Sequence, residues 1–285
     1  MTHVSAVVAV FAAALLGLST ACASSPPSAA PSTTSTAPGI AAPSPSGSPA
    51  PPPSTAPAPA RPKTTSPRPA PSGRAPSTPG APTALVTTTA DSGRYVALTF
   101  DDGPNPTYTP QILALLERYG VHATFCEIGD AAEDYPGLVR EVAADGNRLC
   151  DHTMTHDEQL GTRTWEQIYA QITDGKQTLR SISGASVLYY RQPGGNWTAA
   201  IQQIAADDGM QNLSWSVDPR DWSMPGTSTI VARVEANLRP GSVLLMHDGD
   251  GDVPPGGGDR SESVAALAIL LPWMIAQGYH FDFPA

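Results

Sequence analysis

The chain has 285 residues, with 16 Lys or Arg and 26 Asp or Glu, for a formal net charge of −10. Residues 1–90 contain four of the cations and none of the acids, so the rest carries 12 cations against 26 acids, a formal −14. Acidity of this size argues against nucleic acids and anionic membrane surfaces as partners and favours a neutral or cationic ligand. It would also serve simply to keep an exported protein soluble.

Residues 1–22 are typical of an export signal. Val4–Leu18 is a small and apolar run, too short to span a membrane comfortably but long enough for a signal-peptide core. Ala21-Cys22-Ala23 fits ordinary signal-peptidase cleavage, whereas Leu18–Cys22 resembles a bacterial lipobox that would place a lipid on Cys22. We expect a protein secreted or anchored at the outer face of the membrane, acting at the cell wall, with Cys22 as its only membrane contact.

A disordered linker is predicted over residues 23–90. Of the 31 prolines, 19 lie in residues 23–85, among Ser, Thr, Ala and Gly. Such a segment has too little apolar area to offset the entropy of ordering it, so we expect it to stay extended and solvated. Residues 91–285 then form one folded domain of ordinary size.

Strand-like and helix-like patterns alternate through the predicted domain. Short apolar runs precede amphipathic segments, several of which end at a glycine. We predict strands at 95–100, 123–126, 148–150, 187–190, 213–217, 242–246 and 279–283, and helices at 109–119, 135–145, 164–183, 197–208, 230–238 and 261–277. Alternating strands and helices build a parallel sheet, and about seven such units favour an α/β barrel over a doubly wound sheet.

Polar residues follow the carboxyl ends of five predicted strands. In barrels this face carries the chemistry, so we expect these residues to meet at one mouth. They are Asp101 and Asp102, Asp151 and His152, Arg191, Asp218 and Asp221, and His247 and Asp248. Together they offer the groups that a hydrolytic metal site needs.

His152 and His156 are four residues apart. On a helical turn both imidazoles would lie on one face, about 5–6 Å apart, which suits one metal ion. Such pairs also occur on solvated surfaces and in satisfied cores. Asp101 or Asp102 would complete a two-His, one-carboxylate set, leaving the other carboxylate to take a proton and His247 as the candidate acid. The same ligand set also admits a non-haem iron oxygenase.

Cys126 and Cys150 each stand near the end of a strand-like run. Export places them in an oxidising compartment. If the two strands are neighbours, we expect a disulfide; the alternative is two separate buried thiols.

Five segments in order resemble the motifs of the polysaccharide deacetylases, the NodB-homology domains of carbohydrate esterase family 4. The resemblance extends over residues 94–283. The segments are Thr99–Gly103, His152–His156, Arg191–Gly195, Asp218–Trp222 and Leu245–His247. The resemblance implies a distorted (β/α) barrel of about seven strands and a divalent metal ion, commonly zinc, with cobalt or another divalent ion as an alternative.

The resemblance also implies a role for each of the central residues. Asp102, His152 and His156 would be the metal ligands, as these positions match the family's first two motifs. Asp101 would be the general base, and His247 would be the general acid that protonates the leaving group.

Other residues would support this set by the same resemblance. Arg191 would orient the base and keep it ionised, and Asp221 would keep the acid protonated. The backbone N–H of Gly194 would complete an oxyanion site. Family members often have an aromatic residue at the Gly194 position, so one wall of the groove is missing here. Trp197 or Trp222 would replace it, unless either simply packs in the core.

The implied activity is hydrolytic removal of acetyl groups from an extracellular or cell-wall polysaccharide. N-deacetylation of N-acetylglucosamine units in peptidoglycan or a chitin-like glycan is the favoured reading. An O-deacetylase of the acetylxylan esterase type would use the same residues. A non-catalytic glycan-binding module would lack part of the metal and proton-transfer set, and no member is missing. We expect a monomer, with residues 248–261 forming a flexible connection rather than a lid.

Overall fold

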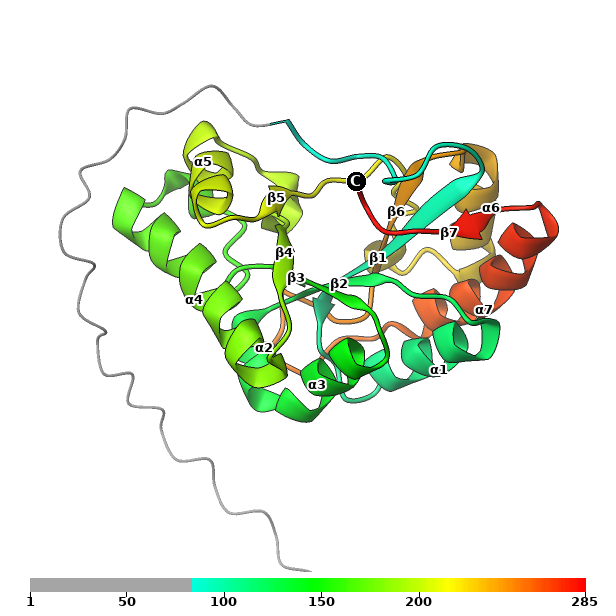
Figure 1. Cartoon of the computed structure of the whole chain (residues 1–285). Coiled ribbons are helices and arrows are strands. Elements are labelled where there is room, and N and C mark those ends of the chain that lie inside the picture. The colour runs from blue at the N-terminus through cyan, green and yellow to red at the C-terminus, as the bar shows by residue number, and fades with distance from the viewer. Residues whose placement is uncertain (1–83) are drawn as a thin grey trace, which may run out of the picture. The chain divides into compact units, whose positions relative to one another are not determined.

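The computed structural model describes residues 84–285. The predicted export signal, Cys22 and nearly all of the predicted linker lie outside the described residues. One parallel sheet of seven strands curls into a distorted barrel, in the order β5-β4-β3-β2-β1-β6 with β7 paired to β1 (Figure 1). The predicted (β/α) barrel is therefore confirmed.

The strands match the predicted runs closely in most places. They are β1 (Tyr95–Gly103), β2 (Thr124–Glu127), β3 (Arg148–Asp151), β4 (Val187–Tyr190), β5 (Gln211–Asn212), β6 (Ser242–His247) and β7 (His280–Phe281). The helices are α1 (Thr109–Tyr119), α2 (Gly129–Asp134), α3 (Pro136–Ala144), α4 (Trp165–Ser183), α5 (Ala199–Asp207), α6 (Thr227–Asn237) and α7 (Ser261–Ala276). Three short 3-10 turns are η1 (Leu160–Thr162), η2 (Pro193–Gly195) and η3 (Asp221–Ser223).

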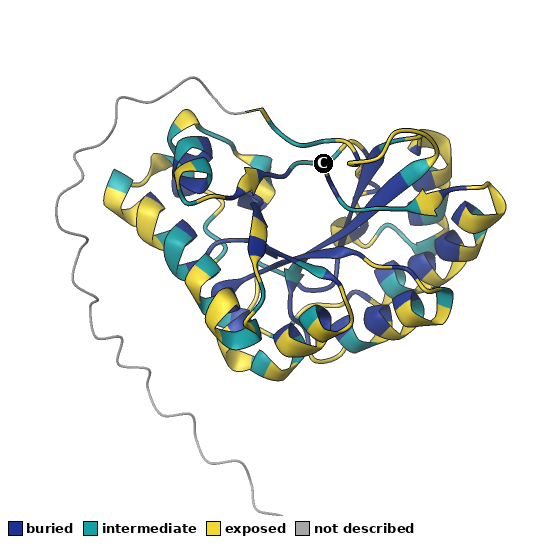
Figure 2. Ribbon diagram, viewed as in Figure 1, coloured by how far each residue is buried: buried dark blue, intermediate teal, exposed yellow. Residues whose placement is uncertain are grey.

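Local sequence accounts for where the helices begin and end. Helix α4 begins with a capping box, in which Thr164 and Gln167 each accept a hydrogen bond from the other's backbone N–H. It ends at Gly184, whose positive φ of 70° suits the left-handed conformation that closes a helix. The helices lie along the outer side of the curled sheet and turn their buried faces to it (Figure 2). No helix within residues 84–285 combines the length and the apolar character that crossing a bilayer requires.

Alternation along β1 divides its side chains between two apolar clusters. Val96, Leu98 and Phe100 belong to the large core that includes the buried helix faces. Ala97 belongs to a smaller cluster with residues of β2, β3, β4 and β6. Because successive strand residues point to opposite faces, Asp101 shares the Ala97 side and stands at its carboxyl end. The strand thereby carries Asp101 to the mouth of the barrel.

A disulfide joins Cys126 and Cys150, as predicted. The two cysteines are register partners on β2 and β3, and both are completely buried. The bond belongs to the smaller cluster and therefore lies on the same side of the sheet as Asp101.

The segment predicted as a strand at 213–217 forms no continuous strand in the structure. The strand β5 covers only Gln211–Asn212, and the following residues leave it. Leu213 then pairs with Val86, and Val217 pairs with Leu244. The segment thus passes from the β4–β5 side of the sheet to β6, and no continuous ladder joins the two edges.

The folded contacts begin before the predicted boundary at residue 91. Val86, Thr88 and Thr89 form β-bridges to Leu213, Ser242 and Pro284, respectively. These bridges place residues 86–89 against the ends of the sheet. These residues were predicted as part of the linker because the segment before them has a low apolar content. Two smaller differences are α2, which was not predicted, and β7, which is shorter than the predicted strand at 279–283.

We predict that loss of the disulfide destabilises the domain. The bond closes a sequence separation of 24 residues, which corresponds to about 3 kcal/mol in the chain-entropy model of the unfolded state. The double variant Cys126→Ala/Cys150→Ala should show a free energy of unfolding in urea that is lower by about this amount. Wild-type protein without reductant is the reference, and equal midpoints for the two proteins would contradict the prediction.

Candidate functional site

Three side chains at the barrel mouth form a set of metal-binding geometry. The Nε2 atom of His152 lies 3.3 Å from Oδ1 of Asp102, and Nε2 of His156 lies 3.1 Å from the same oxygen. One ligand atom from each residue falls within 4.8 Å of the others. This set is the only one of its kind within residues 84–285. Two imidazoles and one carboxylate leave further positions open on a bound ion.

The two histidines do not occupy a helical turn, so that prediction is wrong. Residues 152–157 form an irregular loop in which Thr153 and His156 have positive φ values of 67° and 58°. The hydroxyl of Thr153 accepts a hydrogen bond from the backbone N–H of His156 and stabilises the turn. The ring centroids are 5.1 Å apart, within the expected separation, but the loop and not a helix produces it.

The contacts of His152 fit a metal ligand. Its Nδ1 lies 2.8 Å from the carbonyl oxygen of Arg191. A carbonyl can only accept, so Nδ1 carries the proton and the lone pair of Nε2 faces Asp102. Burial alone would raise the pKa of Asp102, but the close His152 and His156 imidazoles and the positive charge of His247 outweigh it and hold that pKa well below its usual value. The carboxylate is therefore ionised, as a metal ligand must be.

Asp101 lies beside this set and is held by a buried guanidinium. The NH1 group of Arg191 is 2.6 Å from Oδ1 of Asp101 and also donates to the Thr99 hydroxyl at 3.0 Å. The rest of the guanidinium donates to the carbonyl oxygens of Leu213 and Ser214. Arg191 is completely buried, so its position is determined by these partners. The predicted pairing of Arg191 with Asp101 is present.

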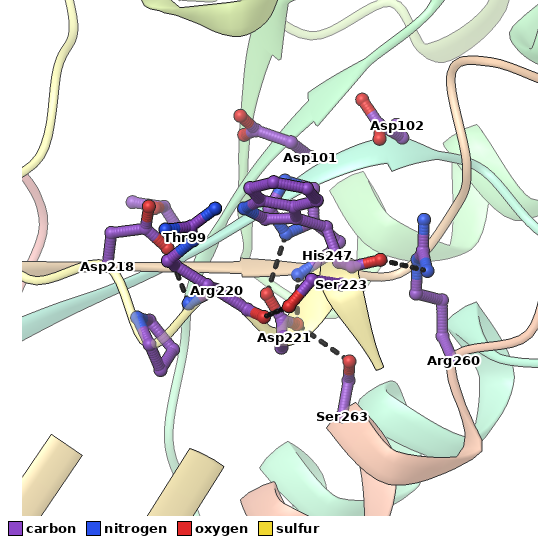
Figure 3. A network of polar contacts seen from close by, with 12 residues as sticks. Thr99, Asp101, Asp102, Asp218, Arg220, Asp221, Ser223, His247, Arg260 and Ser263 are labelled. Carbon is purple, nitrogen blue, oxygen red and sulfur yellow. Dashed lines mark hydrogen bonds and ion pairs between the residues drawn. The ribbon is translucent and has the colours of Figure 1, made fainter. Parts of the chain in front are cut away.

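His247 at the end of β6 forms a second charged pair, with Asp221. Its Nδ1 lies 2.8 Å from Oδ1 of Asp221, and its backbone N–H donates to Oδ2 at 2.9 Å. The Ser263 hydroxyl of α7 donates to Oδ2 at 2.6 Å, so the carboxylate is held from both sides (Figure 3). Burial would lower the pKa of His247, but the charge of Asp221 and the bond to it outweigh burial and raise that pKa to about 9. The imidazole therefore carries a proton at neutral pH.

The remaining strand-end residues separate into two groups. Asp151 and Asp248 are completely buried, and burial raises the pKa of Asp151 well above its ordinary value and that of Asp248 to about 7. Neither residue lines the cleft described below. Asp218 is exposed, lines the cleft and accepts a hydrogen bond from the backbone N–H of Arg220.

The metal-binding set opens into a cleft with a volume of 470 Å³. Asp101, Asp102, His152, His156 and His247 all line it, so one member of each charged pair and the three candidate ligands face one space. Residues 250–253 of the loop after β6 line the same cleft, and Asp250 in this loop is paired with Arg260 at 3.1 Å. The cleft therefore brings a carboxylate base, a protonated imidazole and a candidate metal site together.

Gly194 also lines the cleft, and its backbone has a positive φ of 61° in η2. Trp222 lines the cleft as well and is 44% exposed, with the Arg220 guanidinium 5.0 Å from its ring. Trp197 instead packs edge-to-face on Tyr190 in the core, with ring centroids 5.8 Å apart. Of the two tryptophans considered as a replacement wall, only Trp222 is placed to form one.

Comparison with known proteins decides the family. A family model described as polysaccharide deacetylase matches residues 88–213. A peptidoglycan-N-acetylglucosamine deacetylase of Bacillus cereus is 40% identical over 203 residues, which cover 70% of this chain and 91% of the relative. The chain belongs to the polysaccharide deacetylase family.

Further relatives of this polysaccharide deacetylase agree in sequence and fold. A chitooligosaccharide deacetylase of Sinorhizobium fredii is 40% identical over 191 residues, covering 65% of this chain and 87% of the relative. The crystal structure of the Bc1960 peptidoglycan N-acetylglucosamine deacetylase, in complex with 4-naphthalen-1-yl-N-oxidanyl-benzamide, superposes with a TM-score of 0.64. That match is 31% identical and covers 70% of this chain and 89% of the other. The family and the enzyme class predicted from the five motifs are confirmed.

Sequence reasoning missed several residues of the deacetylase cleft. Glu158, Gln192 and Trp215 line it but belong to none of the assigned roles. Ser263 contacts Asp221 from a helix 42 positions further along the chain. Trp215 was visible only as part of an apolar run, and no sequence signal distinguished Ser263 from other serines at a helix start.

We predict that His247 titrates near pH 9 in chelator-treated protein, because Asp221 favours the imidazolium. In the variant Asp221→Asn, the largest opposition to burial is removed and only the charges of Asp102 and Asp101 still favour the imidazolium, so the pKa of His247 should fall. Since the folded-state pKa is raised, the pair's contribution to stability is complete below about pH 6.5 and is lost as pH rises through 9. Histidine NMR across this range measures both proteins, and a neutral His247 at pH 7 in wild type would disprove the assignment.

Proposed function

We propose that this deacetylase is an exported, metal-dependent enzyme that hydrolyses the N-acetyl group of N-acetylglucosamine units in peptidoglycan or a chitin-like glycan. One observation carries the proposal. The cleft joins the Asp102, His152 and His156 set to two buried pairs, Asp101 with Arg191 and His247 with Asp221. Hydrolysis of an amide needs these three elements: an electrophile, a base for the water and an acid for the amine.

The metal site is proposed on its donor set. Asp102, His152 and His156 would hold a divalent ion, and two imidazoles with one carboxylate favour zinc among the common ions, with cobalt as an alternative. A bound divalent ion would polarise the acetyl carbonyl and acidify the attacking water.

The two charged pairs divide the proton transfers. Asp101 accepts the proton of the attacking water, and Arg191 keeps its carboxylate directed into the cleft. His247 is protonated at neutral pH and gives its proton to the departing amine, while Asp221 stabilises the imidazolium. Gly194 lines the same cleft, and its backbone N–H would donate to the developing oxyanion.

An N-acetylated substrate is supported by the relatives. Those at 40% identity are named for peptidoglycan N-acetylglucosamine and for chitooligosaccharides. Nothing in the cleft or among these relatives favours an ester substrate. An amide also releases a poorer leaving group than an ester, which makes the proton of His247 more important.

The proposed location rests on the N-terminal sequence. The apolar run of residues 4–18 and the small residues around Cys22 support export, with or without a lipid anchor. The Pro-rich residues that follow would act as a spacer between an anchor and the catalytic domain. A wall glycan lies within reach of a protein attached in this way.

We expect acetate release from N-acetylated glycans and loss of that release with a chelator. Full-length protein is incubated with peptidoglycan, N-acetylchitooligosaccharides and acetylated xylan, and acetate is measured by mass spectrometry. Activity should return when zinc or cobalt is added back. Release from xylan alone, or release that the chelator does not reduce, would contradict the proposal.

Two variants separate the roles of the neighbouring site residues. Asp101→Asn should lower kcat by about 10²–10⁴-fold, the usual contribution of a general base, and should keep bound zinc near the wild-type amount. His152→Ala should lose zinc, measured as metal content after dialysis. The exposed Glu235→Gln on α6 is the matched control and should change neither. Equal zinc loss in both site variants would show that Asp101 is not separate from the metal site.

A further inference from the structure

Trp215 stands in the segment that passes between the two edges of the sheet. The residues two positions before and after it, Leu213 and Val217, form β-bridges to Val86 and Leu244. The indole packs on the inner cluster of the barrel, and the Arg191 guanidinium lies 5.8 Å from its ring centroid. It remains partly exposed and lines the cleft that holds the catalytic pairs.

Two glycines leave room for this ring. A Cβ on Gly195 would lie 2.7 Å from the Trp215 indole, so a side chain at that position would displace it. Gly194 and Gly195 both have positive φ, of 61° and 68°, and Gly195 presents bare backbone beside the indole. The aromatic residue expected at the Gly194 position is absent, but Trp215 from the segment after β5 supplies an aromatic wall beside Gly195.

Polar groups surround the same position. The Glu158 carboxyl lies 3.2 Å from where a Cβ on Gly194 would be. The Asn196 side-chain amide donates to the Glu158 carbonyl oxygen at 3.2 Å, which joins this edge to η2. Within the described part of the chain, Glu158 takes part in no ion pair, so its carboxylate is available to a ligand in the cleft.

An indole face with a polar edge has the chemistry that recognises a pyranose ring. The ring of a hexose presents apolar C–H groups on its faces and hydroxyl groups around its rim. An indole covers the former, and carboxylate and amide groups bind the latter. The cleft volume of 470 Å³ falls in the range of about 300–1,000 Å³ usual for ligand sites, so the cleft has room beyond the acetyl group itself.

We propose that Trp215, the Gly194–Gly195 backbone, Glu158 and Asn196 form a subsite for a second sugar of the glycan. This inference rests on the proposed function. The acetyl group must reach Asp101 and His247, whereas a sugar stacked on Trp215 is held by its ring face. The subsite therefore binds a pyranose neighbouring the unit that loses its acetyl group, and it makes the enzyme selective for oligomers over single sugars.

The test compares substrates that do and do not reach the subsite. Full-length wild type, Trp215→Ala and Trp215→Phe are assayed on N-acetylchitooligosaccharides of one to five units and on 4-nitrophenyl acetate. Trp215→Ala should lower kcat/KM on the longer oligomers, mainly through KM, about tenfold more than it lowers kcat/KM on the ester and the monosaccharide. Trp215→Phe should restore part of the dependence on chain length. Trp197→Phe, in the core and away from the cleft, should leave that dependence unchanged.

The outcomes distinguish this proposal from the proposed function. If wild type releases no acetate from any glycan, the proposed function fails. If wild type is active but both Trp215 variants lose the same factor on every substrate, Trp215 only supports the fold and the subsite is disproved. Should Trp215→Ala fail to fold, Trp215→Phe and Glu158→Gln decide the matter, because each must lower the ratio of tetramer to ester activity by about threefold.

Discussion

The site depends on a single buried cation, the Arg191 guanidinium. Its NH1 group binds Asp101, and its own backbone carbonyl accepts from Nδ1 of His152. One residue directly after β4 therefore orients the proposed carboxylate base of β1 and selects the tautomer of a proposed metal ligand after β3. Burying such a charge is costly, and the interaction is stable only because every contact around the guanidinium is satisfied by a carboxylate, a hydroxyl or a carbonyl. Removing Asp101 would leave this buried charge without compensation.

The parallel barrel makes this convergence possible. Five carboxyl strand ends open at one mouth, and each delivers its polar residue where the ladder stops. The backbone then departs from regular conformations at the residues that meet the ligand. Asp102 has a φ of 74° and His156 a φ of 58°, both in the left-handed region that non-glycine residues rarely occupy. Two of the three proposed metal ligands thus occupy strained positions, which is where a fold can be expected to accept such a cost.

The cleft is strongly acidic, so part of the negative charge of the folded domain is concentrated at the site. Glu158, Asp218 and Asp252 line it in addition to the two aspartates of β1, and Arg260 is the cation that is paired there with Asp250. Under the proposed function, the deacetylated glucosamine unit would carry a positive charge at neutral pH, so carboxylates near the mouth would be compatible with both substrate and product. The aromatic rings of Trp215 and Trp222 supply the apolar surface that a sugar requires and that acids alone cannot offer.

The sequence by itself determined most of the elements and the family. Hydrophobic periodicity identified nearly every strand and helix, and the polar residues at the strand ends identified the mouth of the barrel. The five ordered motifs then identified the family and the residues of the metal set. Tertiary structure alone decided how these groups are held. The loop conformation of the two histidines, the crossing of residues 213–217 from one sheet edge to the other, and the contacts of Ser263 and Trp215 all depend on neighbours far away in the chain. Hydrophobic periodicity in the sequence indicates which face of a helix or strand is apolar. It does not indicate which side chain from a distant part of the chain packs against that face.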